Sequence, residues 1–341
     1  MKIAGFDIGG ANTDLAVVDF NKDGAIENIS TAFEYLPMWS DNHRLGEVLL
    51  KLIGEVDELS AIDGIGISMT AELVDAYETK NEGVIDIYEK VMEVFNVPVG
   101  FIGVNGFLSS SDAVKHPLEL AAANWVGTAS LIAEICENCI FVDIGSTTTD
   151  IIPIKNGKEV AKGRSDFERL ATGELVYTGT LRTNLCSFLD EIELNNKSYN
   201  VASELFATTA DIFTVLDKIS PEDYSCATSD GLGKSKEEAM TRISRVLCAD
   251  METLSKDDII SVSNYIYKKQ VEQIAKSLKK VCEGEELNKV ITTGLGGNIL
   301  GVKAAKLLGL DWESMDDYFT HEQSVVAPAI GTAVLVFKNF H

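Results

Sequence analysis

The N-terminal part of the chain alternates between two hydrophobic patterns. Apolar residues three or four positions apart predict helices over 45–56 and 82–95, and small apolar residues predict a longer helix over 117–136. Continuous apolar runs over 62–69 and 97–104 predict strands. This alternation predicts an α/β domain.

The C-terminal part ends with the same kinds of element. A strand over 289–293 opens into the turn Gly294-Leu-Gly-Gly-Asn298, and a helix is predicted over 299–308. Such a strand, glycine turn and helix form a general cradle for a nucleotide or another ligand. A last helix over 324–338 carries a face of alanine and glycine, which lets two helices approach closely. We expect it to cross back to the first domain as part of a hinge.

An internal repeat organises the chain. The residues from Asp7 to Asp14 align without a gap with those from Asp143 to Asp150, and five of the eight positions are identical. The two copies lie 136 residues apart, which is about the length of one domain. Each copy has apolar runs on both sides, so each predicts a β-hairpin with a small polar turn. Repetition of the acid spacing argues against two ordinary turns.

The residue types of these hairpins suit a phosphate and a metal ion. Glycine lets backbone N–H groups approach an anion, and hydroxyl and amide side chains add donors. The expected phosphate-binding residues are Gly9, Gly10, Asn12, Thr13, Gly145, Ser146, Thr147, Thr148 and Thr149. An ionised carboxylate only accepts hydrogen bonds, so its natural role here is to hold Mg²⁺. The expected metal ligands are Asp7, Asp14, Asp143 and Asp150.

Two further segments are candidates for binding a nucleotide or a substrate. Thr70 and Glu72 follow the strand over 62–69, at the strand end where open α/β sheets place ligand contacts. A helix cap followed by an acid explains the same residues equally well. The second candidate is the glycine turn, with Gly294, Gly296, Gly297 and Asn298.

Composition and charge narrow the class of protein. The 341 residues suffice for about two domains, with 45% hydrophobic and 24% charged residues. Acids outnumber bases by 53 to 29, and the net charge of −24 disfavours nucleic acids and anionic membranes as partners. An anionic substrate would therefore need a metal ion or local Lys and Arg residues.

The sequence shows no leader or membrane segment, and we expect a cytoplasmic protein with reduced thiols. Cys136 and Cys139 form a CxxC that lacks a second ligand pair, so a metal or redox role is the less favoured interpretation. The four histidines have no ligand-like spacing, and no role is assigned to them. The oligomeric state is left open.

These hairpins, the glycine turn and the small-residue helices resemble the superfamily of actin, Hsp70 chaperones and sugar kinases. The resemblance implies two ribonuclease-H-like α/β domains that close over a phosphate-bearing ligand, with a helix-rich insert in the second. The first domain would comprise 1–130 and the C-terminal helix 325–341, and the second 131–324 with an insert over about 164–285. Asp14, Asp150 and the 68–73 segment narrow the resemblance to the hydantoinase/oxoprolinase branch.

Three stretches of the insert carry a more specific resemblance. Residues 163–183, 207–213 and 226–234 are similar to an archaeal and methylotroph family linked to one-carbon metabolism with tetrahydromethanopterin and methanofuran. That family implies a transferase that makes the methanofuran core. An aminomethyl-furan methyl diphosphate would react with the phenol of γ-glutamyltyramine to give an ether and diphosphate.

The insert offers residues that suit this chemistry. Arg164, Arg182 and Lys234 could neutralise the departing diphosphate, as could Arg169. A phenol has an ordinary pKa of about 10, so a general base would help. Asp211 is the first candidate for this base and Asp150 the second. The arginines could equally be surface ion-pair partners, and Asp211 and Lys234 could belong to helix starts.

Two other functions compete with this one. The first is an ATP-dependent kinase or hydantoinase/oxoprolinase-type enzyme that uses the same residues for Mg²⁺-ATP, with the glycine turn holding adenosine. Against it, the chain is much shorter than the large ATP-dependent oxoprolinases. The second is a non-catalytic nucleotide switch. An Hsp70-like function would need a substrate-binding β-domain, and the sequence ends at His341 without one.

Overall fold

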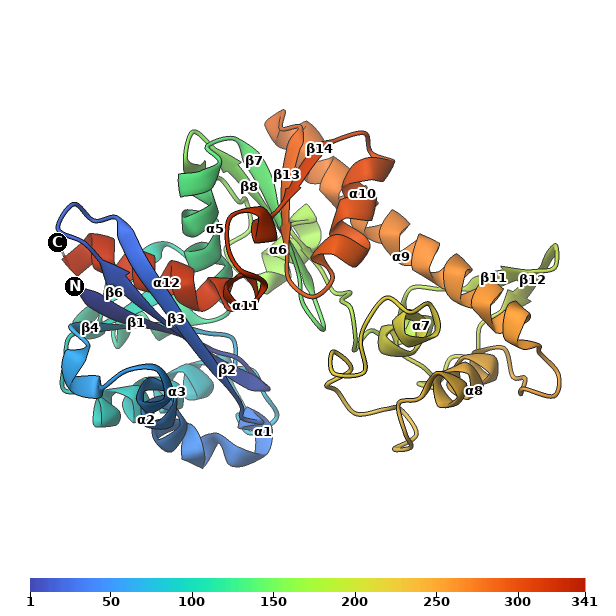
Figure 1. Cartoon of the computed structure of the whole chain (residues 1–341), viewed down its shortest axis with the longest axis horizontal. Helices are drawn as coiled ribbons and strands as arrows, with labels where there is room; N and C mark the ends of the chain where they lie inside the picture. The colour runs from blue at the N-terminus through green and yellow to red at the C-terminus, as the bar shows by residue number, and fades with distance from the viewer. Residues whose placement is uncertain (341) are drawn as a thin grey trace. The chain divides into compact units, whose positions relative to one another are not determined.

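The computed structural model describes residues 1–340, and the chain divides into two compact units. The first unit comprises Met1–Cys139, Ile152–Arg169 and Asp316–His341, and the second comprises Ile140–Ile151 and Leu170–Met315. The boundary passes through two strands, Cys139–Ile144 and Thr149–Lys155, the short helix Asp166–Thr172 and the 3₁₀ turn Met315–Asp317. Figure 1 shows the elements of both units.

The first unit contains a six-stranded sheet in the order β3-β2-β1-β4-β5-β6. Its strands are β1 (Lys2–Ile8), β2 (Asn12–Phe20), β3 (Ile26–Tyr35), β4 (Gly64–Met69), β5 (Val99–Gly103) and β6 (Gly106–Ser109). β1 is antiparallel to β2 and parallel to β4, which is in turn parallel to β5. The carboxyl ends of β1, β4 and β5 therefore lie at the same edge of the sheet.

Helices cover both faces of this sheet, as Figure 1 shows. They are α1 (Met38–Asp41), α2 (Leu45–Val56), α3 (Lys80–Val94), α4 (Ser110–Ala113), α5 (Asn124–Ile135), α11 (His321–Val325) and α12 (Ala327–Phe340); the chain also contains the short α6 (Asp166–Thr172). The predicted small-residue helix packs on the first unit, because α12 lies against β1 and α5. A Cβ added to Gly5 of β1 would lie only 2.7 Å from the Ala333 nitrogen, so the helix and the strand are in close contact.

The continuous helix predicted over 117–136 is wrong. A 3₁₀ turn spans Pro117–Leu120, and α5 begins only at Asn124. Between them Ala122 has a φ of 51°, in the left-handed region that a non-glycine residue adopts at a cost. The break places Asn124 in the first turn of α5 instead of mid-helix.

The second sheet repeats the order of the first. β10, β8, β7, β13 and β14 are neighbours in that order, and β9 pairs with β8. Their bounds are β7 (Cys139–Ile144), β8 (Thr149–Lys155), β9 (Lys158–Glu159), β10 (Leu175–Val176), β13 (Lys289–Thr293) and β14 (Asp311–Ser314). As in the first sheet, the first strand of the hairpin pairs in parallel with a later strand, here β7 with β13, and β13 pairs in parallel with β14. The fold is thus α/β with two ribonuclease-H-like sheets, as predicted.

A helix-rich insert separates β10 from β13. It consists of α7 (Thr209–Val215), α8 (Lys236–Val246) and α9 (Lys256–Glu285), with the hairpin of β11 (Glu191–Leu194) and β12 (Lys197–Asn200). The 30-residue α9 packs against α10 (Val302–Leu307) and against α7, α8 and β11 (Figure 1). The helix predicted over 299–308 is shorter, because its first turn over Gly297–Gly301 is π-helical. Four remaining 3₁₀ turns span Asn42–Arg44, Leu59–Ala61, Leu185–Ser187 and Met315–Asp317.

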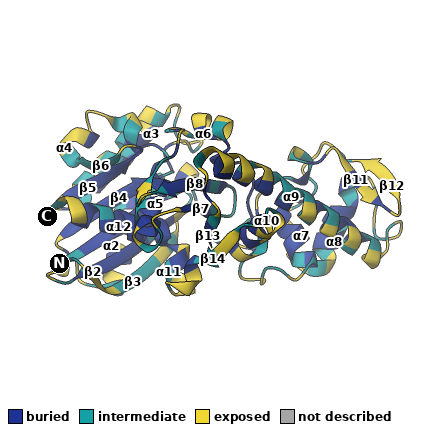
Figure 2. Cartoon of the chain, turned by 90° about the horizontal axis from the view of Figure 1, so that it is seen from above, coloured by how far each residue is buried: buried dark blue, intermediate teal, exposed yellow. Residues whose placement is uncertain are grey.

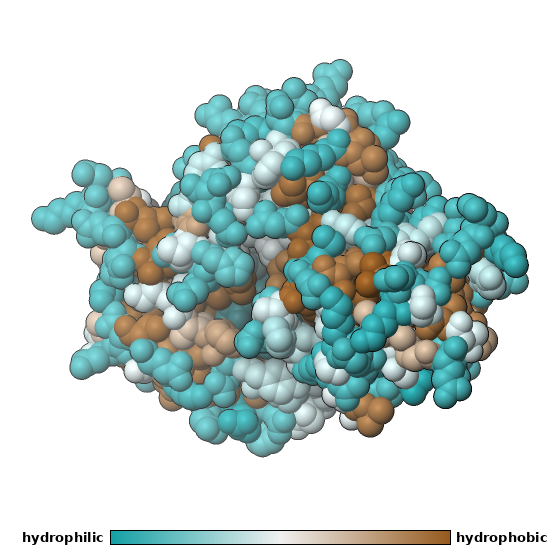
Figure 3. Space-filling model, turned by 45° about the vertical axis from the view of Figure 1, so that its right-hand side comes forward, coloured by the Kyte–Doolittle hydropathy of each residue, from teal (hydrophilic) through white to brown (hydrophobic). Residues whose placement is uncertain are grey.

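Each unit has its own hydrophobic core, and Figure 2 shows β4 and β5 as buried and β12 as exposed. The face drawn in Figure 3 is mostly hydrophilic, and its apolar side chains form separate groups. Among residues 1–340, no helix combines the length and apolar character needed to cross a bilayer.

Candidate functional site

The first hairpin brings two carboxylates together. Asp7 of β1 and Asp14 of β2 are directly paired in the strand register. Burial, and then the negative charge of Asp7, raise the pKa of Asp14 to about 8. Two like charges this close are costly, and a bound cation would relieve that cost. This donor chemistry fits Mg²⁺, which takes one or two protein carboxylates together with phosphates and water.

Neighbouring side chains hold the Asp7 carboxylate in place. Asn124 donates from Nδ2 to Asp7 Oδ2 at 3.0 Å, and Ser68 Oγ lies 3.1 Å from Asp7 Oδ1. Thr332 of α12 donates to Ser68 Oγ at 3.0 Å. The sequence did not reveal Asn124 or Thr332 as site residues. The positive φ of Ala122, which puts Asn124 at a helix start, has no signature in the sequence.

The turn of this hairpin is only partly arranged for a phosphate. The Gly9 N–H donates to the Asn12 carbonyl at 2.9 Å, and the Asn12 side chain is exposed. Thr13 is fully buried, so its hydroxyl does not face a ligand at the turn. The N–H groups of Gly10 and Ala11 donate to no acceptor within residues 1–340. A phosphate here would meet Gly10, Ala11 and Asn12.

Thr70 lies next to the same turn, and Glu72 follows it in the chain. A Cβ on Gly9 would lie 3.8 Å from the Thr70 hydroxyl. Glu72 is 2% exposed, its Oε2 accepts no hydrogen bond, and its Oε1 lies 4.0 Å from Lys80 Nζ. Burial raises the pKa of this carboxyl, and Lys80 offsets part of the effect. Glu72 is therefore enclosed by protein, close to Lys80.

The second hairpin closes its turn in the same way. The Gly145 N–H donates to the Thr148 carbonyl at 3.0 Å, which is the equivalent of the Gly9 bond 136 residues earlier. The N–H groups of Ser146, Thr147 and Thr148 donate to no acceptor within residues 1–340. Thr149 faces away from this turn, because its buried hydroxyl donates to the Thr178 carbonyl at 2.8 Å.

A second segment lies directly against this turn. The N–H groups of Leu181 and Arg182 both donate to the Ser146 carbonyl at 2.9 Å. Position 179 needs a glycine, because a Cβ there would lie only 2.5 Å from the Thr147 nitrogen. Arg182 is thus fixed by its backbone to the turn, and its side chain is exposed.

Arg182 is the one arginine of six that makes no ion pair within residues 1–340. The other five are paired with nearby carboxylates: Arg44, Arg164, Arg169, Arg242 and Arg245. In a chain with such an excess of acids, an exposed guanidinium without a carboxylate is unusual. It is available to an anion bound at the Ser146–Thr148 turn.

Arg164 and Arg182 belong to different units of the chain. Arg164 lies in the first unit, where it donates to Glu159 at 2.6 Å. Arg169 also lies there, almost fully buried against the Trp125 ring at 4.7 Å. Arg164 thus has the surface ion pair that the sequence left open, whereas Arg169 is buried and lies 3.6 Å from Asp166.

The glycine turn after β13 lies against the second hairpin. Gly294 has a φ of 78°, and a Cβ there would lie 2.5 Å from Asp143 Oδ1. The Gly296 N–H donates to the Ile144 carbonyl at 2.9 Å. Gly297 is buried, whereas the Asn298 side chain is exposed. The second unit therefore assembles Asp143, the Ser146–Thr148 turn and the glycine turn, which the sequence predicted separately.

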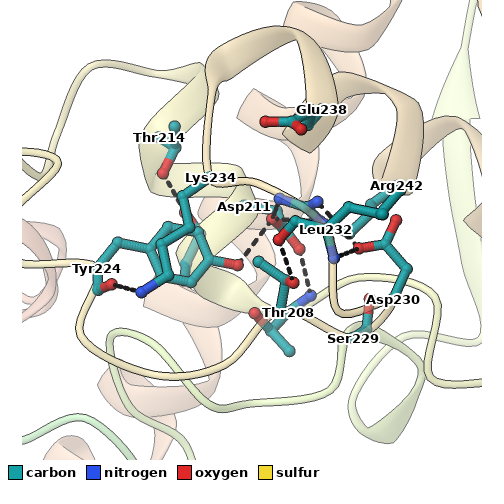
Figure 4. Close-up of polar contacts among 12 residues, drawn as sticks. Thr208, Asp211, Thr214, Tyr224, Ser229, Asp230, Leu232, Lys234, Glu238 and Arg242 are labelled. Atoms are coloured by element: carbon teal, nitrogen blue, oxygen red, sulfur yellow. Dashed lines mark hydrogen bonds and ion pairs between the residues drawn. The ribbon is translucent and has the colours of Figure 1, made fainter.

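Lys234 and Asp211 belong to one hydrogen-bonded cluster, drawn in Figure 4. Lys234 donates to the Tyr224 carbonyl at 2.5 Å, and the Tyr224 hydroxyl donates to Asp211 Oδ1 at 2.9 Å. Asp211 is fully buried and ion-paired with Arg242 at 2.8 Å. Arg242 was not identified from the sequence, because nothing in a helical pattern marks a buried arginine.

This cluster touches the phosphate-type turn through apolar neighbours. Leu181 and Tyr224 belong to one buried group, against which Cys226 and Leu295 pack. Burial raises the pKa of the Cys226 thiol, and the positive charges of Arg182 and Lys234 act in the opposite direction. Both cations therefore lie near Cys226. Within residues 1–340 no group of three or more His, Cys, Asp and Glu is arranged for a metal, so each hairpin offers only its carboxylates.

Comparison with known proteins gives consistent relationships. The hydantoinase/oxoprolinase family model matches residues 63–339. The (4-{4-[2-(gamma-L-glutamylamino)ethyl]phenoxymethyl}furan-2-yl)methanamine synthase of Methanocaldococcus jannaschii is 45% identical over 339 residues, which cover 99% of this chain and 98% of that protein. A synthase of the same name from Methanococcus vannielii is 41% identical over 208 residues, covering 60% of this chain and 93% of that protein.

A solved structure is similar in fold alone. The nucleotide-free structure of acetone carboxylase, from work on ATP-dependent acetone carboxylation, has a TM-score of 0.58 and 11% identity. The similarity covers 98% of this chain and 70% of that chain.

Proposed function

The chain belongs to the hydantoinase/oxoprolinase family, and we infer that within it the chain is an ether-forming transferase of methanofuran biosynthesis. The product named for its relatives contains a phenoxymethyl group on a furan, so an ether oxygen joins a phenol to the furan methylene. The acceptor is accordingly the phenol of γ-glutamyltyramine. The donor is an aminomethyl-furan whose methylene carries a leaving group.

We propose that this leaving group is diphosphate and that the second hairpin binds it. The observation that supports this is Arg182, an arginine without an ion pair whose backbone is bonded to the Ser146 carbonyl. Beside it, the free N–H groups of the Ser146–Thr148 turn offer donors for phosphate oxygens. Lys234 adds a second cation near Cys226.

Mg²⁺ fits the carboxylates of the hairpins. At the second hairpin Asp143 would hold it directly and Asp150 through water, which leaves the Asp150 carboxylate able to accept a proton; Asp7 and Asp14 form the equivalent pair at the first. When bound, the metal supplies positive charge that stabilises the departing diphosphate. Arg182 and Lys234 supply the same kind of charge from the protein.

The bond changes balance with these groups alone. The phenol oxygen forms a bond to the furan methylene, and the bond from that carbon to the diphosphate oxygen breaks with its electron pair. The phenolic proton passes to a carboxylate. Of the two candidates for this base, Asp150 is partly exposed and Asp211 is fully buried, so we assign the proton to Asp150.

The test is a reaction of the purified protein with Mg²⁺, the furfuryl-type diphosphate and γ-glutamyltyramine, without ATP. We expect ether by mass spectrometry and diphosphate release that requires the phenol. An ether that forms only when ATP is added and hydrolysed would instead establish the ATP-dependent alternative. That alternative is favoured by one observation, the glycine turn that lies against Asp143.

A further inference from the structure

Arg242 of α8 is a fully buried cation with four polar contacts. Its Nε and Nη2 lie 2.9 and 2.8 Å from Asp211 Oδ1. Its Nη1 donates to the Gly233 carbonyl at 3.0 Å and to Asp230 Oδ1 at 3.2 Å. Burying a guanidinium is costly, and these contacts compensate for the lost hydration (Figure 4).

Asp211 is closed to a substrate by burial and by its protein donors. Besides Arg242, its carboxylate accepts from the Tyr224 hydroxyl at 2.9 Å and from the Thr208 N–H at 3.0 Å. Those donors surround a carboxylate with no exposed surface. A general base must reach the proton that it removes, and Asp211 does not. Its carboxylate instead binds Arg242 and Tyr224 and caps the start of α7 through the Thr208 N–H.

Two of the routes that fix Lys234 end at this ion pair, while Glu238 accepts from the N–H groups of Gly233 and Ser235 on either side of it. The first runs along the chain, because Gly233 and Asp230 of the 226–234 loop are held by Arg242. The second runs through Tyr224, whose carbonyl accepts from Lys234 and whose hydroxyl donates to Asp211. The Lys234 ammonium also lies 5.1 Å from the Tyr224 ring centre. The ion pair therefore contributes, through the loop and through Tyr224, to the position of an exposed lysine.

We propose that Arg242, paired with Asp211, is a positioning residue that holds the 226–234 loop so that Lys234 can bind the diphosphate together with Arg182. This inference rests on the proposed function, because it concerns the same diphosphate site. Arg242 itself is sealed from solvent and acts only through Lys234. Tyr224 and Leu181, which pack in one buried group, connect this loop to the Arg182 segment.

The experiment is a double-mutant cycle with Arg242→Lys, Lys234→Ala and the double variant. The readouts are kcat, the KM for the furfuryl-type diphosphate and the inhibition constant of inorganic diphosphate. We expect each single variant to raise KM and the inhibition constant by about tenfold, because one charged hydrogen bond is lost, with kcat changed much less. The double variant should bind diphosphate no more weakly than Lys234→Ala alone.

Arg245→Lys is the matched control. Arg245 is partly exposed on the same helix and contacts only the other oxygen of Asp230, at 3.2 Å. Replacing Arg245 should change the KM for the furfuryl-type diphosphate and the inhibition constant of diphosphate by less than twofold. Should Arg242→Lys fail to fold, Asp230→Asn loosens the loop and leaves the Asp211 pair intact. We expect Asp230→Asn to raise the inhibition constant in the same direction.

Two results would overturn the positioning role. One is a folded Arg242→Lys, or Asp230→Asn in its place, that binds diphosphate as the wild type does. The other is a double variant in which the increases in the inhibition constant caused by Arg242→Lys and by Lys234→Ala multiply. In either case ether synthesis by the wild type without ATP would still stand. Failure of the wild type in that assay would instead remove the proposed function.

Discussion

Asp7 and Asp14 lie opposite each other on neighbouring strands of the first hairpin. Their proximity and burial explain why the pKa of Asp14 is raised to about 8. A protein gains nothing in stability from such a pair, so its natural explanation is a ligand with positive charge. We therefore expect the carboxylates of the hairpins to act through Mg²⁺.

Replacing Asp7 or Asp143 by asparagine should abolish turnover and leave the fold intact. Each change removes one charge from a metal-binding carboxylate but keeps the size of the side chain. We expect kcat to fall by about a hundredfold or more, the order of magnitude found when one electrostatic contact to a transition state is lost. Activity measured against Mg²⁺ concentration, together with circular dichroism, checks this. Full activity in both variants would remove the metal-site argument.

Arg182→Ala should weaken diphosphate binding without affecting stability. The side chain is exposed and has no partner among residues 1–340, so its loss should leave the folded protein unchanged. We expect the inhibition constant of diphosphate to rise by about tenfold or more. Arg44→Ala is the control, because Arg44 is partly exposed in the first unit and pairs only with Glu47 at 3.8 Å. If both variants raise the inhibition constant equally, the effect comes from the net charge of the protein and not from a diphosphate site at Arg182.

Gly179→Ala should damage the second hairpin. The new Cβ would lie 2.5 Å from the Thr147 nitrogen, so the turn must move. We expect a loss of about 1–3 kcal/mol in the free energy of unfolding and weaker diphosphate binding. Gly54→Ala is the matched control, since nothing lies within 4 Å of a Cβ there. In helix α2 it should stabilise the protein by about 0.5–1 kcal/mol. Urea denaturation measures both, and normal binding by a folded Gly179→Ala would contradict the proposed diphosphate site.

Glu72 should make stability depend on pH. Its pKa is raised above the ordinary value of 4.5, so the folded protein holds this proton more tightly than the unfolded chain. The contribution to stability is present below pH 4.5 and is lost as the pH rises through the raised pKa. The melting temperature of Glu72→Gln should therefore exceed that of the wild type by more at pH 8 than at pH 5.

The control for Glu72 is Glu89→Gln, on the exposed side of α3. It should show no such trend in melting temperature. If the difference in melting temperature between Glu72→Gln and the wild type is equal at pH 5 and pH 8, burial does not raise the pKa of Glu72.

The sequence predicted features that depend on local spacing. The repeat from Asp7 to Asp14 and from Asp143 to Asp150 reappears as two turns closed by equivalent hydrogen bonds. Helix α2 has the predicted bounds, because its apolar spacing alone specifies an amphipathic helix.

Features that depend on distant contacts were missed. Asn124 contacts Asp7 across 117 positions, and only the left-handed backbone at Ala122 brings it there. Arg242 reaches Asp211 across 31 positions, and in its own helix it looks like a surface residue. The same holds for Asp211: the sequence shows an acid near the start of a helix, but it does not show that Arg242 forms an ion pair with it.

The central claim is that the furan methylene loses diphosphate to a phenol without any nucleotide. The most direct measurement places oxygen-18 in the bridging position of the furfuryl-type diphosphate and follows a reaction with Mg²⁺ and no ATP. We predict one equivalent of labelled diphosphate for each unlabelled ether formed. Label retained in the ether, or product that forms only with ATP hydrolysis, would contradict the account.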